Sequence, residues 1–419
     1  MNTQWHKFTF IIVLSVCMTV PLTNDIFISG MPAMKKYFVG SDISLVLSTL
    51  LLGLAIAQLF YGPLLDRFGR RPVLLAGLIL YTLASAVVMT SSSFTLLLVG
   101  RFFQAVGICS AITSSLAIAR DTYKQEELVR AMSLIMAIMG VGPAAAPLIG
   151  SFLNYLWGWR ASFEFLFVLG CFYTIWMYFF LEETHLNKNL EALALNKILK
   201  NYFTLMKQSK FLRYCIISGF SYGVLFSYIN LSPFFIIEKM HFSLISFGAI
   251  VAANALPIII TAIFVPKIAS KFSVQLITQL GLMFIFIGGV TMWALNGFFT
   301  ENIYTFVVPI FIIITGIGMI RPTASAGAMQ LIQSKVAGSA ASFFNLFSFV
   351  SGTVAIAISG KLIHHLFSFG IFIALMGAAA ILAINMLSII GTAEKNSFKI
   401  LLKRKEIYYL RNLILNIFR

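Results

Sequence analysis

Twelve apolar runs, each long enough to cross a lipid bilayer, dominate the chain. A membrane-spanning helix needs about 20 mainly apolar residues. We expect helices near 8–30, 45–65, 73–91, 94–119, 131–153, 163–181, 213–233, 243–265, 274–296, 303–329, 337–359 and 367–391. Of the 419 residues, 59% are hydrophobic and only 11% are charged, more apolar surface than a soluble domain buries. The sequence therefore predicts an all-α polytopic membrane protein.

The twelve runs fall into two groups of six, separated by the longer polar stretch 182–212. We expect an N-terminal six-helix bundle over 1–185, a cytoplasmic linker over 186–212, a C-terminal six-helix bundle over 213–391 and a basic cytoplasmic tail over 392–419. Two bundles joined in this way are typical of secondary transporters, which bind their substrate between the halves near the middle of the membrane. From topology alone, a different twelve-span transporter fold or a membrane enzyme stays open.

The lysines and arginines predict how the chain is oriented. If the N-terminus is cytoplasmic, 23 of the 30 lie in cytoplasmic segments, five lie in outside loops and two lie within spans. Positive residues concentrate on the cytoplasmic side of membrane proteins, so both termini are expected in the cytoplasm. Topology thus explains the net charge of +16 without a nucleic-acid partner. The basic tail is expected to lie on anionic membrane lipid.

No enzyme or metal signature accompanies this topology. The four cysteines all lie in apolar segments and form no C-x-x-C pair, so neither a disulfide framework nor a zinc site is expected. The chain contains no H-E-x-x-H and no P-loop motif. We expect no enzymatic activity, no cofactor and no direct use of ATP.

The loop after the second span concentrates charge and glycine. It reads Gly62-Pro-Leu-Leu-Asp66-Arg67-Phe-Gly69-Arg70-Arg71. Gly62 would let two helices approach closely, and Gly69 would allow a tight turn. An acid at the membrane edge needs a cation, and Arg70 is close in sequence to Asp66. The segment predicts a charge-pair latch that forms in one conformation; a positively charged turn with no gating role is the alternative.

Three charged residues lie deep within the spans, away from their ends. Asp25 is the only acid deep inside an apolar run, and Arg101 and Arg321 are the two cations. A charge at the bilayer centre costs at least about 2.5–3.5 kcal/mol, so such residues face cavities, pair or carry protons. Arg101 is expected either to act with Asp25 or to bind backbone carbonyls. Arg321 is expected to extend to the cytoplasmic edge, with contact to an anionic substrate as the alternative.

The loop after the second span resembles the G-x-L-x-D-R-x-G-R-[RK] signature of the major facilitator superfamily. Further motifs extend the resemblance: Arg101-Phe-Phe-Gln104-Ala-Val-Gly107 in the fourth span and Gly142-x-x-x-Ala146-Pro147-x-x-Gly150 in the fifth, where the superfamily's antiporters carry G-x-x-x-G-P-x-x-G. Shorter pieces, including Asn24-Asp25, are similar to the MdfA-like multidrug/proton antiporters and the Bcr/CflA drug-resistance exporters. The resemblance implies twelve helices in two pseudo-symmetric bundles.

The resemblance also implies roles for individual residues. Asp25 would carry the proton and meet cationic substrates, Arg101 would take part in coupling, and Asp121 would complete the latch with Arg70. The antiporter motif, with Gly142, Ala146, Pro147 and Gly150, would pack against the other half and seal the bundle. MdfA-like proteins carry a second acid two turns before the first, where this chain has Cys17.

Polar residues within the spans are candidates for contact with substrate, because an amide in the membrane needs a partner. They are Asn24, Asp25, Tyr228, Asn230 and Asn254. The resemblance implies a monomeric, proton-coupled exporter of small amphipathic compounds, acting by alternating access in a bacterial inner membrane. A dedicated transporter of one metabolite, such as a siderophore, is the alternative.

Overall fold

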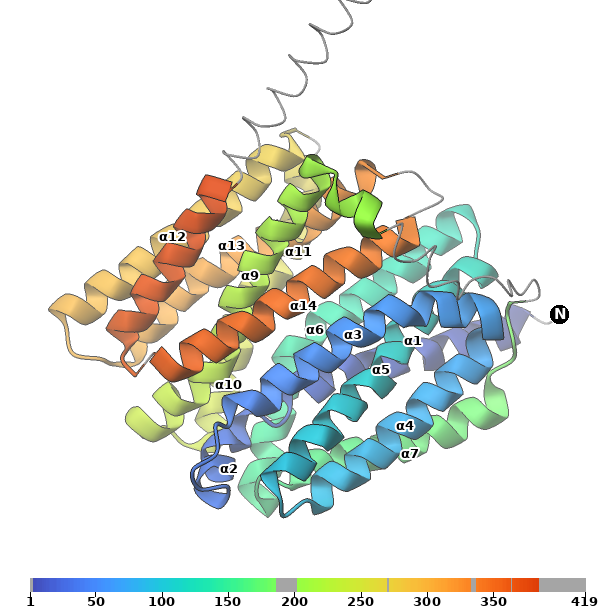
Figure 1. Cartoon of the computed structure of the whole chain (residues 1–419), viewed down its shortest axis with the longest axis horizontal. Helices are drawn as coiled ribbons and strands as arrows, with labels where there is room; N and C mark the ends of the chain where they lie inside the picture. The colour runs from blue at the N-terminus through green and yellow to red at the C-terminus, as the bar shows by residue number, and fades with distance from the viewer. Residues whose placement is uncertain (1–2, 186–201, 270, 333–336, 363, 384–419) are drawn as a thin grey trace, which may run out of the picture.

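A computed structural model of the chain confirms the membrane-spanning architecture (Figure 1). It describes residues 3–185, 202–269, 271–332, 337–362 and 364–383. Within these residues, 12 helices are long and apolar enough to cross a membrane, and most of them begin and end close to the expected positions.

The structural elements follow one another with short connections. They are α1 (Thr3–Asp25), η1 (Ile28–Gly30), α2 (Met31–Tyr37), α3 (Ser44–Phe68), α4 (Arg70–Thr90), α5 (Phe94–Thr122), α6 (Gln125–Trp157), α7 (Ala161–Phe180), α9 (Ser209–Pro233), η2 (Phe234–Lys239), α10 (Leu244–Asn254), α11 (Leu256–Ala269), α12 (Val274–Phe298), α13 (Ile303–Gln330), α14 (Ala337–Leu362) and the last span, Leu366–Ala383. Most of the expected linker (186–201) and all of the expected tail lie outside the described residues.

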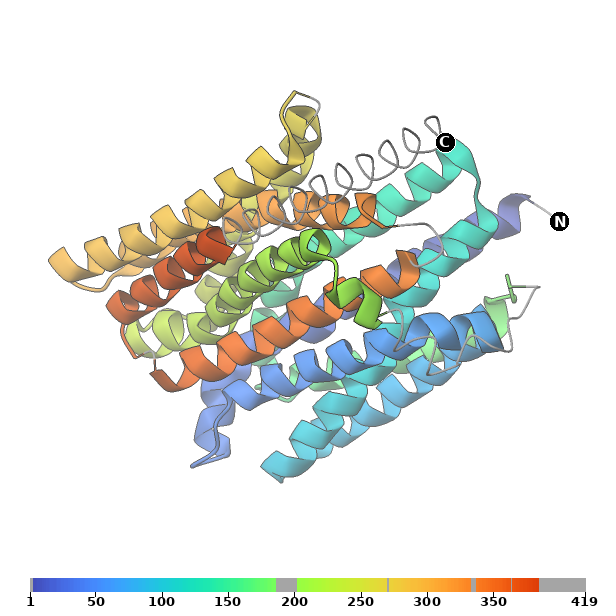
Figure 2. The same ribbon diagram turned by 45° about the horizontal axis from the view of Figure 1, so that its top comes forward.

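The helices form two bundles that lie side by side in both views (Figures 1 and 2). One bundle contains α1 to α7, and the other contains α9 to the last span. The halves meet along two helix pairs, α3 with α14 and α6 with α10. Any pocket between the halves is therefore lined by helices from both.

Two spans are interrupted where the sequence predicts continuous helices. The first span stops at Asp25 and resumes through the short 3₁₀ turn η1 before Pro32 in α2. The eighth span breaks at Ala255, between α10 and α11, just before Pro257. A proline supplies no backbone N–H to the preceding turn, which accounts for a break at each place. Apolar length alone did not reveal either break.

The bundle has two distinguishable ends. We call the end at which α3, α5 and α7 finish the linker end, and the opposite one the far end. At the far end the halves touch closely: a methyl group on Gly248 of α10 would lie 2.7 Å from Ser151 Oγ of α6, and one on Gly360 of α14 would lie 2.5 Å from Ser44 Oγ of α3. By contrast α11, the linker-end part of the eighth span, touches α6 at few positions. These contacts close the far end.

Candidate functional site

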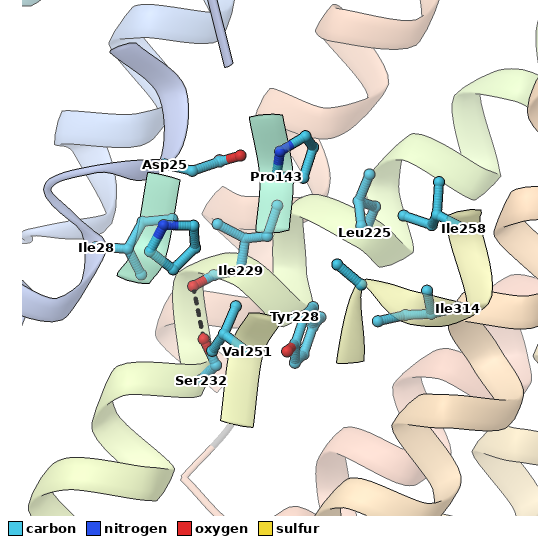
Figure 3. Close-up of a pocket in the computed structure, with 12 residues that line it drawn as sticks. Asp25, Ile28, Pro143, Leu225, Tyr228, Ile229, Ser232, Val251, Ile258 and Ile314 are labelled. Atoms are coloured by element: carbon cyan, nitrogen blue, oxygen red, sulfur yellow. Dashed lines mark hydrogen bonds between the residues drawn. The ribbon is translucent and has the colours of Figure 1, made fainter. Parts of the chain in front are cut away.

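Asp25 lies in a pocket between the two halves (Figure 3). The pocket is lined by Asp25, Ile28, Pro143, Pro147, Leu225, Tyr228, Ile229, Ser232, Val251, Ala255, Ile258 and Ile314. Its volume of about 30 Å³ is room for little more than a water molecule or two in this conformation. The Asp25 side of the pocket comes from the N-terminal half, and the largely apolar opposite wall comes from α9, α10, α11 and α13.

The position of Asp25 follows from the break in the first span. It is the last residue of α1, and it is 5% exposed. Its Oδ1 atom is buried and has no hydrogen-bond partner among the described residues. The carboxyl group therefore keeps an acceptor atom available to a proton, water or ligand that enters the pocket.

Arg101 is fully buried and binds the end of α1 next to Asp25. Its two terminal nitrogens donate to the Thr23 carbonyl oxygen at 3.3 and 3.2 Å, and one of them also donates to Gln104 Oε1 at 2.7 Å. The last carbonyl groups of a helix lack partners within the helix, and they favour a cation. Arg101 supplies both a donor and a charge there. It forms no ion pair with Asp25 within 4.0 Å in the part of the chain described.

A shell of further hydrogen bonds holds this arginine in place. Gln104 donates from Nε2 to Ser85 Oγ at 2.8 Å, and the Thr23 hydroxyl lies 2.9 Å from the Tyr81 hydroxyl. The guanidinium carbon also lies 4.2 Å from the centre of the Phe27 ring. The expected R-x-x-Q motif therefore fixes the end of α1 through its arginine and its glutamine together.

Arg321 does not extend to the membrane edge as expected. It donates to the Tyr222 hydroxyl at 2.8 Å, and its guanidinium carbon lies 4.9 Å from the centre of that ring. Arg321 therefore stays inside the C-terminal half, where a tyrosine on α9 offers it a hydroxyl and a ring face.

The structure separates the polar residues expected to contact substrate. Tyr228 lines the pocket and accepts a hydrogen bond from Asn254 Nδ2 at 3.2 Å, which brings both to the break in the eighth span. Asn24 is partly exposed beside Asp25. Asn230 does not line the pocket: its Nδ2 donates to Ser44 Oγ at 3.1 Å, across the closed far end. The Asn230 side chain therefore forms a contact between the two halves in this structure.

The antiporter motif divides its contacts between the two halves. A methyl group on Gly142 would lie 2.2 Å from Pro21 Cγ, and one on Gly150 would lie 1.7 Å from the Ile26 carbonyl oxygen, so both glycines admit the first span of their own half. The Pro147 carbonyl oxygen and Ser151 instead face Gly248 of α10 in the other half. The motif therefore packs on the other half through Pro147, while its two glycines pack on the first span.

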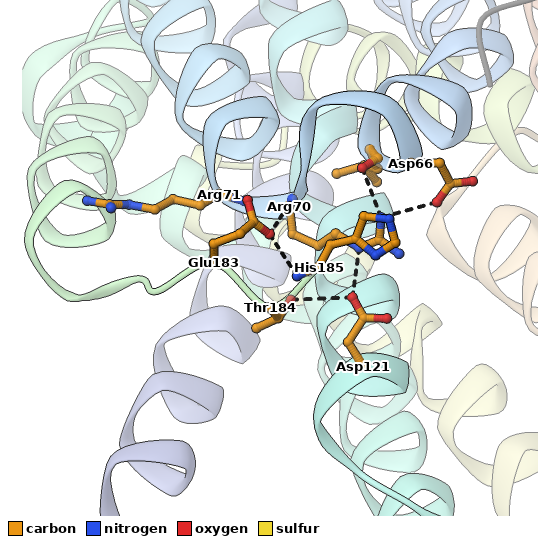
Figure 4. Close-up of polar contacts among 8 residues, drawn as sticks. Asp66, Arg70, Arg71, Asp121, Glu183, Thr184 and His185 are labelled. Carbon is orange, nitrogen blue, oxygen red and sulfur yellow. Dashed lines mark hydrogen bonds and ion pairs between the residues drawn. The ribbon is translucent and has the colours of Figure 1, made fainter. Parts of the chain in front are cut away.

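The charged loop after the second span forms a network at the linker end (Figure 4). Arg70 donates from Nε to Asp121 Oδ2 at 2.8 Å and from a terminal nitrogen to Asp66 Oδ1 at 3.1 Å and to the Leu65 carbonyl oxygen at 2.8 Å. All of these groups belong to the N-terminal half. The expected pairing of Arg70 with both acids is therefore present in this conformation, in which the far end is closed.

Glu183, which follows α7, completes the network and was not expected there. It accepts from the backbone nitrogens of Arg70 and Arg71 at 2.9 and 3.3 Å. Its carboxylate occupies the space beside Gly69, whose φ of +103° favours glycine and where a side chain would collide with Glu183. The first N–H groups of a helix attract an anion. An acid directly after the sixth span was therefore the sequence feature that could have predicted this contact with the start of α4.

Two residues of the loop do not take the expected part. A methyl group on Gly62 would meet nothing within 4 Å, so this glycine allows no close approach of helices here. Arg67 lies over the ring of its neighbour Phe68 at 5.4 Å. The network therefore centres on Arg70.

Two six-helix bundles around an interior pocket with one acid define the class of protein: a secondary transporter. The chain belongs to the Major Facilitator Superfamily, which it matches over residues 13–356. It is similar to two solved transporters, a D-xylose-proton symporter (TM-score 0.74, 14% identity, 90% of this chain and 97% of the other) and a peptide transporter (TM-score 0.73, 14% identity, 92% and 94%). These likenesses show the fold.

Relatives in sequence include proteins named for drug resistance. The chain is 32% identical to multidrug resistance protein D of Escherichia coli K12 over 290 residues, which is 68% of this chain and 71% of that protein. It is 28% identical to a bicyclomycin resistance protein homolog of Haemophilus influenzae over 296 residues, 70% and 74% of the two chains. The family resemblance inferred from the motifs is thereby confirmed.

Proposed function

We propose that this protein is a proton-coupled exporter of small amphipathic compounds, which it carries across a bacterial inner membrane by alternating access. One observation carries the proposal: the single acid deep inside the described spans lies in the pocket between the halves, with one carboxylate oxygen unpaired. The drug-resistance names of its relatives support the choice of compounds, and the apolar pocket wall suits amphipathic ones.

In the proposed cycle, Asp25 binds a proton or a substrate but not both. Protonation removes the charge that attracts a basic group of the substrate, so arrival of one ligand favours release of the other. Arg101 transmits this change, because it is bound to the Thr23 carbonyl oxygen on the same turn of α1. Asn24, Tyr228 and Asn254 supply polar contacts at the edge of an otherwise apolar pocket.

The orientation follows from the distribution of lysine and arginine. We place both termini and the linker end in the cytoplasm, with an N-terminal half over 1–185, a linker over 186–212, a C-terminal half over 213–391 and a tail over 392–419. The closed far end then faces outward, and compounds load from the cytoplasmic side. Reporter tags at either terminus and within the linker should be cytoplasmic, and a periplasmic signal from the linker would contradict this arrangement.

The decisive experiment is a substrate screen in an efflux-deficient bacterial host, followed by proton release from purified protein in detergent. A transported compound should release protons from the wild-type protein but not from Asp25→Asn, which keeps the shape of the side chain and loses its titratable group. Glu164→Gln is the matched control, because Glu164 lies in the first turn of α7, outside the pocket. Unchanged release from Asp25→Asn would move the coupling site elsewhere, with Asp121 the next candidate.

The same screen separates the proposal from a transporter dedicated to one metabolite. Export of several chemically unrelated compounds, each dependent on the proton gradient, is the expected result. Movement of one compound alone, a siderophore for example, would favour the dedicated transporter.

A further inference from the structure

We infer that Arg321 and Tyr222 form an anion-binding site on the C-terminal half, and that the preferred substrates are amphipathic compounds that carry an acidic group. The inference rests on the proposed transport function and narrows its substrate class. It assigns a role to the one interior cation that the N-terminal motifs leave unexplained.

Helix periodicity places this pair directly beside the pocket. Arg321 follows the pocket residue Ile314 by seven positions on α13, which is about two turns along the same face. Tyr222 precedes two pocket residues of α9, Leu225 and Ile229, by three and seven positions, again on one face. The Arg321–Tyr222 pair thus adjoins the pocket on its linker-end side, where a compound entering from the linker end reaches it before Asp25.

The chemistry of the pair suits an anion. A guanidinium group has five N–H donors in a planar fork that matches a carboxylate. In this structure Arg321 is only partly buried, and its one side-chain hydrogen bond among the described residues is the one to Tyr222 Oη. No carboxylate of the described chain lies within 4.0 Å of it. The guanidinium group therefore retains N–H donors for a ligand, and its hydrogen bond to Tyr222 fixes the direction in which those donors point.

The balance of interior charge points the same way. Deep inside the described spans there are two cations, Arg101 and Arg321, and one acid, Asp25. Arg101 is already committed to the Thr23 carbonyl oxygen. No carboxylate of the described chain pairs directly with Arg321, so an acidic group of the substrate can supply its counter-charge while Asp25 exchanges its proton for the basic group. A zwitterionic compound can bind Arg321 through its acid and Asp25 through its basic group.

A matched pair of compounds tests this directly. Norfloxacin carries a carboxylate and a basic amine, and its methyl ester keeps the amine and lacks the carboxylate. We expect full-length protein in proteoliposomes with an imposed proton gradient to transport the acid faster than the ester. Arg321→Gln should lower transport of the acid at least about tenfold, because it removes a charged hydrogen-bond donor, and should leave the ester unaffected.

Three further variants sharpen the result. Arg321→Lys should retain part of the acid transport, since the charge stays and the fork is lost. Tyr222→Phe should cause a smaller loss than Arg321→Gln. Arg213→Gln is the matched control, because Arg213 precedes Tyr222 by nine positions, on the opposite face of α9, and it should alter neither compound.

Equal losses of both compounds in Arg321→Gln would overturn the inference in favour of a structural role. A wild-type preference for the ester would overturn it as well, while gradient-driven ester transport would leave the proposed function standing. Loss of gradient dependence for both compounds in the wild-type protein would instead contradict the proposed function. The two failures are thereby distinguished.

A measurement independent of transport checks the anion site itself. In a variant whose native cysteines are replaced, Leu225→Cys puts a thiol in the pocket one turn from Tyr222. The anionic reagent 2-sulfonatoethyl methanethiosulfonate and its trimethylammonium counterpart then report the local field. We expect the ratio of anion to cation rates to fall about tenfold when Arg321→Gln is added. An unchanged ratio would show that Arg321 does not attract anions into the pocket.

Discussion

Arg101 and Thr23 join the fourth span to the first at the point where the first span breaks. Two nitrogens of the Arg101 guanidinium group donate to the Thr23 carbonyl oxygen at 3.2 and 3.3 Å, two residues before Asp25. A carbonyl in the last turn of a helix has no partner within that helix. The arginine thus acts as a cap for α1, and it positions the acid without touching it.

Arg101→Lys tests this capping role. Lysine keeps the charge but cannot span the Thr23 carbonyl oxygen and Gln104 together, so we expect a loss of transport of at least about tenfold. The pH at which substrate releases protons should also shift, because Asp25 is no longer held in place. The measurement is proton release across a pH series, alongside efflux.

Gln104→Leu provides the comparison for that variant. It removes the hydrogen bond to Arg101 but leaves the Thr23 contact, and it should lower transport less than Arg101→Lys does. Equal transport in Arg101→Lys and the wild-type protein would show that the charge alone suffices.

Asp121→Asn should impair transport more than Asp66→Asn. Both acids pair with Arg70, but the Asp121 side chain is 21% exposed and the Asp66 side chain is 54% exposed. Exposed ion pairs contribute only about 0–1 kcal/mol, so Asp66→Asn should slow transport a few-fold without preventing insertion. The measurement is the initial efflux rate of each variant, normalised to the amount of protein in the membrane. Arg67→Gln is the control. A ranking in the reverse order would contradict the geometry of the network.

Gly150→Ala should lower the thermal stability of the purified protein, whereas Gly140→Ala should not. The added methyl group would lie 1.7 Å from the Ile26 carbonyl oxygen at position 150 and would meet nothing within 4 Å at position 140. Overpacking of this kind costs about 1–3 kcal/mol. Both glycines lie in α6, so melting curves monitored by fluorescence compare the same substitution in the same helix. Equal midpoints for the two variants would disprove close packing of α6 on the first span.

A disulfide between Ser151→Cys and Gly248→Cys should stop transport. A Cβ atom on Gly248 would lie 2.8 Å from Ser151 Cβ, so a small adjustment brings the two thiols to bonding distance. In a background without native cysteines, oxidation should abolish thiol labelling and transport together, and reduction should restore both. Continued transport by the oxidised protein would mean that the far end need not open.

The spans themselves could be predicted because apolar length is a strong signal for membrane helices. The breaks after Asp25 and at Ala255 could not, because prolines such as Pro32 and Pro257 also occur in membrane helices that continue without a break. The sequence therefore placed Asp25 in a helix without revealing that it ends one.

The site was predicted best where sequence neighbours interact and worst where distant spans meet. Asp66 and Arg70 are four residues apart, about one helical turn, so their ion pair could be predicted from the sequence. The partner of Arg321 is Tyr222, on another span, and no pattern along the chain indicates which tyrosine faces which arginine. The contact between Asn230 and Ser44 could not be predicted for the same reason, because Ser44 lies in the other half.

The break in the first span also bears on how the protein is made. Backbone carbonyl groups left open within the hydrocarbon layer are costly until they find donors. Here the Thr23 carbonyl oxygen accepts from Arg101, and the Ile26 carbonyl oxygen accepts from Ser162 Oγ at 3.1 Å. Both donors are synthesised later than the first span, in the fourth and sixth. The first span therefore completes these hydrogen bonds only once the sixth has been made, which links the folding of the spans of the N-terminal half.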